Sequence, residues 1–124
     1  MRLNQRRYGD ALVLSPVGRL DQDSSEGFRT ELQPLLEGAV REGNSIVLDL
    51  SGLEYVSSAG LRCFSLAAKQ ARAQGSKIVV AGMTPLVAEI FQISRFNMLF
   101  DIHPGVREAL VAVSPSAVAA YDRG

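Results

Sequence analysis

The sequence predicts an α/β fold: a mixed β-sheet, opened by an N-terminal hairpin, with parallel central strands and about four helices. Two observations carry this prediction. Residues 46–50 and 78–81 form continuous aliphatic runs, which are typical of strands covered on both faces. Segments with apolar residues at helical spacing lie between and after these runs. Strands that alternate with helices are expected to form right-handed parallel crossovers.

The first predicted element is the hairpin. Gly9-Asp10 is a turn-forming pair that separates residues 3–7 from residues 11–17, and the second of these ranges begins with an apolar run. A short turn between two such segments favours antiparallel pairing. The sheet is therefore expected to begin with an antiparallel pair of strands.

The next predicted element is a helix with one apolar face, on which Phe28 and Leu32 are followed by further apolar residues as far as Ala39. Asp23 and Glu26, three residues apart, resemble a capping box at its start. Pro34 lies inside the pattern and lacks a backbone N–H. We therefore expect Pro34 to kink the helix or to displace its start.

Three further helices are predicted. The second has an apolar stripe from Leu61 through Phe64 to Ala71. Thr84-Pro85 combines an N-cap residue with proline at the first helical position, which marks the start of the third. Residues 106–113 are expected to form the last one. We assign residues 1–113 to a single domain and expect residues 114–124, which are rich in small residues after Ser-Pro-Ser, to be a flexible tail.

Composition excludes several classes of function. The 13 basic and 13 acidic residues balance, and no basic cluster exceeds the Arg6-Arg7 pair, so a nucleic-acid partner is not expected. No stretch approaches the roughly 20 apolar residues of a membrane span, and no apolar run follows the basic N-terminus, so we expect a cytoplasmic protein without membrane insertion. Cys63 and His103 are the only residues of their kinds, so no disulfide, zinc site or cofactor is expected.

Residues 49–62 form the segment that bears most directly on function, because they lead from a buried strand through a loop into a helix. Ser57 is the expected N-cap, and Ser58 is expected in the first turn with its hydroxyl near solvent. Gly60 lacks a side chain, which would let another protein approach closely. A phosphate on Ser58 would be tolerated at a helix N-terminus but would oppose a partner docked there. The alternative is that both serines only cap the helix, and spacing alone does not decide between the two.

Three motifs resemble the STAS-domain family of anti-sigma-factor antagonists, and they follow one another along the chain in the order that the family shows. They are the residues from Tyr55 to Leu61, the Gly18-Arg19-Leu20-Asp21 segment, and the Gly82-Met83-Thr84-Pro85 turn, and the likeness spans about residues 8–110. The resemblance implies the STAS fold. It also implies that the unphosphorylated protein captures an anti-sigma factor that is itself a serine kinase of the histidine-kinase-like ATPase type, which frees the sigma factor.

The resemblance further implies which residues form the switch. Ser58 aligns with the serine that the kinase phosphorylates and that a PP2C-type phosphatase restores. The best-known members have aspartate where this chain has Ser57 and serine where it has Ala59, so Ser57 is the alternative acceptor. Asp21 is expected to orient the switch loop or to repel the phosphate, or else to cap a turn. The predicted partner-binding set is Asp21, Ser57, Ala59, Gly60 and Arg62.

Other residues are interpreted more plainly. Ser58 has no base identifiable beside it and lies in no Gly-x-Ser-x-Gly elbow, which indicates a substrate of phosphorylation and no catalytic residues. Cys63 is expected to be buried and inert, and His103 to be an ordinary loop residue. The apolar residues from Phe91 to Phe100 are expected in the core, with an interface as the alternative. Two rival functions stay open: a constitutive STAS scaffold subunit of a transport or sensory complex, and a small enzyme or nucleotide-binding domain, for which no Gly-rich motif is present.

Overall fold

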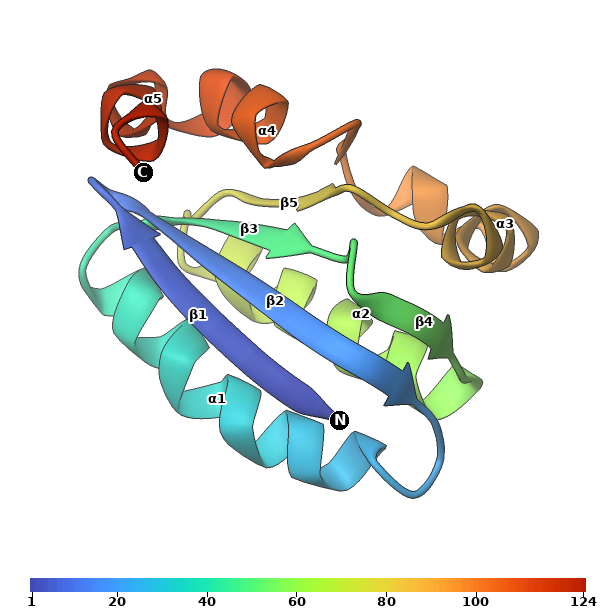
Figure 1. The fold of residues 1–124 in the computed structure, drawn as a ribbon. Coiled ribbons are helices and arrows are strands. Elements are labelled where there is room, and N and C mark those ends of the chain that lie inside the picture. Colours follow the sequence, from blue (N-terminus) through green and yellow to red (C-terminus); the bar gives the residue numbers. More distant parts are fainter.

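A computed structural model describes residues 1–124 and contains a mixed sheet of six strands (Figure 1). The strand order is β1-β2-β3-β5-β6, and β4 pairs with the second half of β2. Only the β1–β2 hairpin is antiparallel, and all other pairs are parallel. This confirms the predicted hairpin and the parallel central strands. The strands are β1 (Arg2–Tyr8), β2 (Ala11–Leu20), β3 (Ser45–Asp49), β4 (Leu53–Val56), β5 (Ile78–Ala81) and β6 (Ile102–His103).

Helices cover both faces of the sheet, with α1 and α2 on one side and α4 and α5 on the other (Figure 1). The predicted starts at Thr84-Pro85 and Val106 agree with the structure, and Thr84 Oγ1 accepts a hydrogen bond from the Val87 N–H at 3.4 Å. There are five α-helices where about four were expected. The helices are α1 (Ser25–Arg41), α2 (Ser58–Ala73), α3 (Pro85–Ile93), the 3-10 turn η1 (Phe96–Met98), α4 (Val106–Val113) and α5 (Pro115–Asp122).

The sheet separates two apolar cores of unequal size. The larger contains 23 buried residues and is crossed by aromatic contacts of Phe64 with Phe28 and Phe91, whose ring centroids lie 5.7 and 6.2 Å away. The smaller contains eight buried residues and joins the opposite sheet face to α4 and α5. Successive residues of β2 enter different cores, Leu12 the larger and Val13 the smaller. This two-sided burial explains why the strand sequences are continuously apolar.

The start of α1 differs from the expected capping box. The N-cap is Ser24, and the Asp23 and Glu26 pair is not used. Instead the Ser24 N–H donates to Asp21 Oδ1 at 3.0 Å, while the Asp21 N–H donates to Ser24 Oγ at 3.0 Å. The reciprocal pair therefore forms two residues earlier than predicted, where the chain leaves β2.

Pro34 does not displace the start of α1, which begins at Ser25 and runs through the proline to Arg41. Pro34 is exposed, while Leu32 and Leu36 on either side of it are buried in the larger core. Burial of this apolar face compensates for the hydrogen bond that proline cannot donate.

Residues 114–124, expected to be a flexible tail, form helix α5 over most of their length. Ala117 is fully buried, and the Tyr121 ring packs edge-on against Tyr8 with centroids 5.2 Å apart. Arg107 also pairs with Asp122 at 3.0 Å. The small residues let α5 lie close to the hairpin, and alanine is a strong helix former, so this segment is ordered.

Candidate functional site

Strand β4 brings two distant motifs of the sequence together. It runs parallel to the end of β2, with Arg19 opposite Tyr55 and Leu20 opposite Val56. The Ser57 N–H then donates to the Leu20 carbonyl at 2.8 Å. The Gly18–Asp21 and Tyr55–Leu61 segments therefore meet where β4 ends and α2 begins.

The two serines at this point have different surroundings. Ser57 is the N-cap of α2 and is half-buried, and its Oγ accepts a hydrogen bond from the Gly60 N–H at 3.2 Å. Ser58 is the first residue of the helix and is exposed, and its hydroxyl makes no hydrogen bond within the protein. The predicted cap and the predicted solvent-facing position of Ser58 are both confirmed. Of the two hydroxyls, only that of Ser58 makes no hydrogen bond within the protein.

The helix start offers a favourable environment for an anion at Ser58. The first turn of α2 contains no acidic residue, and the helix dipole places partial positive charge there. Arg62 lies one turn later, on the same side of the helix as Ser58, and is exposed. The two ion pairs of the structure lie elsewhere, at Arg7–Glu42 and Arg107–Asp122, so Arg62 has no carboxylate partner.

Ala59 and Arg62 border a hollow of about 240 Å³ between α1 and α2. Its floor includes Cys63, and Leu66 at its edge is 41% exposed. Arg29 contributes a second cation from the α1 side. The hollow begins beside Ser58 and combines apolar surface with two cations and one carboxylate, that of Glu26, so its net charge is positive. Apolar surface with arginine is a feature of protein-docking surfaces.

Asp21 is engaged in the turn that opens α1. The hydrogen bond from the Ser24 backbone N–H, followed by that from the Ser24 hydroxyl, holds the pKa of its carboxyl below the ordinary value. This geometry corresponds to the turn-capping alternative. Asp21 still lies next to the start of α2, because the carbonyl of the preceding residue, Leu20, accepts a hydrogen bond from the Ser57 N–H.

Arg19 belongs to this site but was not singled out from the sequence. Its guanidinium carbon lies 4.6 Å from the centroid of the Tyr55 ring, an arrangement that stabilises both side chains at the rim of the site. The signal was present in the Gly18–Asp21 motif, which contains Arg19. Its contact with Tyr55 depends on the pairing of β2 with β4, and no pattern in residues 53–56 indicates a separate strand.

Gly60 has a different role from the one expected. It is buried, and a Cβ atom added there would lie 2.7 Å from Leu20 Cγ and 2.8 Å from Val56 Cγ2. The missing side chain therefore lets α2 pack against the ends of β2 and β4. It does not open the surface to a partner.

Three other residue predictions have mixed outcomes. Cys63 is buried as expected, and burial raises the pKa of its thiol. His103 lies in strand β6 and not in a loop. In the apolar segment, Phe91 and Phe100 are in the core as predicted, while Ile93 and Met98 are 76% and 82% exposed.

No group of three or more metal-ligating side chains comes together in the fold. None of the helices has both the length and the apolarity that crossing a bilayer requires.

Comparison with known proteins identifies relatives over most of the chain. A family model described as "Mlab, STAS domain" matches residues 3–102. The Bordetella bronchiseptica protein named "Putative anti-sigma factor antagonist BtrV" is 33% identical over 118 residues, which cover 95% of this chain and 98% of the relative.

Solved structures share the fold at low sequence identity. An anti-sigma factor antagonist from Mycobacterium paratuberculosis superposes with a TM-score of 0.77 at 18% identity, covering 90% of this chain and 92% of that one. The Bacillus cell fate determinant SpoIIAA in its phosphorylated form gives a TM-score of 0.65 at 17% identity, over 90% of this chain and 99% of that one. These likenesses establish the architecture, with helices on both faces of a mixed sheet.

Proposed function

This chain belongs to the STAS-domain family that includes anti-sigma factor antagonists, and on that premise we propose that it is such an antagonist, switched by phosphorylation of Ser58. The observation that carries the proposal is the exposed Ser58 hydroxyl, which lacks a hydrogen bond within the protein and lies in the first turn of α2. No neighbouring base hydrogen bonds to it, so we assign Ser58 the role of phosphate acceptor and not of nucleophile.

We propose that the unphosphorylated surface around Ser58 binds an anti-sigma factor that is also a serine kinase of the histidine-kinase-like ATPase type. The neutral part of this surface is Ala59, and its cationic part is Arg62. The hollow between α1 and α2 supplies its apolar part. A phosphate adds about 1.5 to 2 negative charges at pH 7, and burying an unpaired charge at an interface costs several kcal/mol. Phosphorylation would then release the partner, and a PP2C-type phosphatase would restore binding.

The phosphorylated protein would keep its fold under this proposal. The unpaired N–H groups at the start of α2 and the nearby Arg62 stabilise an anion, and no carboxylate lies in the first turn to oppose it. The switch therefore acts on the interface. The scaffold alternative is less favoured, because the relative that matches nearly the whole chain carries the name of an anti-sigma factor antagonist.

Incubation with the histidine-kinase-like ATPase of the same organism and ATP tests the proposal directly. We expect one phosphate per chain, detected by mass spectrometry, and complex formation by the unmodified protein only. A protein that stays unmodified, and binds a transporter subunit regardless of a charge at Ser58, would replace this function with the scaffold.

Phosphate is expected on Ser58 and not on Ser57. The Ser57 hydroxyl is held by the Gly60 N–H, whereas the Ser58 hydroxyl projects into solvent. Ser58→Ala should abolish phosphorylation and leave stability nearly unchanged. Ser57→Ala should keep the site of modification but lose about 1 kcal/mol of unfolding free energy with the helix cap.

Phosphopeptide mapping and urea melts of both variants measure these effects. Phosphate that persists in Ser58→Ala, together with its loss from Ser57→Ala, would reverse the two assignments.

A further inference from the structure

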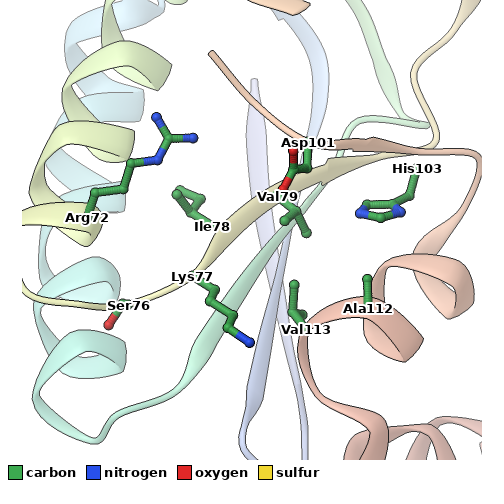
Figure 2. A pocket seen from close by; sticks show the side chains of 9 residues that line it. All are labelled: Arg72, Ser76, Lys77, Ile78, Val79, Asp101, His103, Ala112 and Val113. Carbon is green, nitrogen blue, oxygen red and sulfur yellow. The ribbon is translucent and has the colours of Figure 1, made fainter. Parts of the chain in front are cut away.

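A second candidate site lies at the other end of α2, about 20 Å from Ser58 by the rise of a helix. It is a cavity of about 380 Å³ between the end of α2, the start of β5, strand β6 and the end of α4 (Figure 2). This volume is at the lower end of the range of small-molecule pockets. The proposed switch does not use it.

The sheet itself creates the opening. Strand β6 has two residues, which pair with Val80 and Ala81 of β5. The first half of β5, Ile78 and Val79, therefore has no neighbouring strand on that edge. Edges of this kind are usually covered, and here the side chains of Ala112 and Val113 from α4 face Val79 across a gap (Figure 2).

One wall of the cavity is aliphatic and its rim is charged. Ile78, Val79, Ala112 and Val113 form the apolar wall. Arg72 and Lys77 carry positive charge and Asp101 carries negative charge, so the charges sum to one net positive charge. Neither cation takes part in an ion pair of the protein.

The two cations differ in how far they are already engaged. The Arg72 guanidinium donates to the Leu99 carbonyl and lies 5.7 Å from the centroid of the Phe100 ring, which fixes it. Lys77 is exposed and makes no hydrogen bond within the protein, and its side chain lines the same cavity as Val113 (Figure 2). Lys77 therefore has three donors available next to apolar surface.

His103 supplies a polar group on the opposite side. Its imidazole is directed toward the cavity (Figure 2), and its Nε2 atom is buried without a hydrogen-bond partner. A buried polar nitrogen left unpaired costs free energy. Because this atom has almost no exposed surface, a ligand in the cavity would contact the imidazole ring and not Nε2. The cavity thus offers an ammonium group, an imidazole ring and an aliphatic wall.

We propose that this cavity binds a small aliphatic carboxylate, with its chain against Val79 and Val113 and its carboxylate at the Lys77 ammonium. The net positive charge favours an anion over an amine. The aliphatic wall beside the ammonium suits an anion that carries a hydrocarbon chain, and inorganic phosphate has no such chain to place against Val79 and Val113.

Titration of the ¹⁵N-labelled full chain with butyrate, followed by amide chemical shifts, tests this site. Two probes of the same length, n-butylammonium and 1-butanol, separate charge from hydrophobic contact. We expect saturable shifts confined to β5, β6 and the end of α4 with butyrate, and weaker binding of both other probes.

Lys77→Gln is expected to raise the dissociation constant for butyrate at least about fivefold, since it removes a charged hydrogen-bond donor. Lys69→Gln is the matched control, because Lys69 is the other lysine of the chain and is exposed on α2 outside the cavity. Equal affinity of the Lys77 variant, binding of n-butylammonium as tight as that of butyrate, or shifts that never saturate would each overturn the proposal.

Discussion

Replacing Ser58 by aspartate is expected to weaken binding of the partner kinase at least about tenfold, or about 1.4 kcal/mol. The same change should alter the free energy of unfolding by less than about 1 kcal/mol. The two effects separate because Ser58 is exposed and its hydroxyl has no partner within the protein, so the domain loses no contact when it is replaced. In the complex the same position would be covered by another protein.

A negative charge at position 58 is expected to stabilise the free domain and to destabilise the complex. In the free domain a carboxylate in the first turn of α2 gains about 0.3 to 1 kcal/mol from the helix dipole. At the interface it must lose water against a surface suited to a neutral hydroxyl, which is unfavourable. Aspartate carries one charge and phosphate nearly two, so the aspartate effect is a lower bound for the modification.

Ser58→Asn is the matched control, because asparagine has the size of aspartate without its charge. Calorimetric titration of the three proteins against the partner, together with their urea melts, measures affinity and stability separately. Loss of affinity in the asparagine variant equal to that in the aspartate variant would make size the cause and would contradict an electrostatic switch. If both variants bound the partner as tightly as the parent protein, Ser58 would have no role in binding and would only begin helix α2.

The fold was predictable where local chemistry decides it. The aliphatic runs at residues 46–50 and 78–81 became β3 and β5, and Thr84-Pro85 began α3. Strand β4 was missed because four residues with mixed polarity carry no periodic signal, and it exists through pairing with β2. Helix α5 was missed for a similar reason, since its small residues show their use only against the hairpin.

In the candidate site, too, the features set by nearby residues could be predicted and those set by distant residues could not. Ser57 and Ser58 were placed correctly, since capping depends on residues within one helical turn. The contact of Arg19 with Tyr55 and the packing role of Gly60 depend on residues far away in the chain. A glycine in a helix start looks the same in sequence whether it faces a partner or a core, and only the positions of Leu20 and Val56 decide between them.

Gly60→Val is expected to lower the free energy of unfolding by about 3 kcal/mol, which is a large part of the roughly 5 to 15 kcal/mol that stabilises a typical domain. The first added carbon alone would lie 2.7 Å from Leu20 Cγ, well inside van der Waals contact. Leu20 and Val56 are 0% and 2% exposed, so neither side chain can move outward. Helix α2 must then shift away from the ends of β2 and β4, which also moves Ser57 and Ser58.

Gly27→Val provides a closely matched control, because Gly27 is the third residue of α1 as Gly60 is the third residue of α2. An added Cβ at Gly27 meets no atom within 4 Å, so we expect a stability change within about 0.5 kcal/mol. Urea melts of both variants, with Gly60→Ala as a milder step should Gly60→Val not fold, measure the difference. Equal losses at the two glycines would mean that the loss at Gly60 does not come from its close approach to Leu20 and Val56. A Gly60 variant as stable as the parent would show that α2 is not closely packed on β2 and β4, and would reopen Gly60 as part of the partner-binding surface.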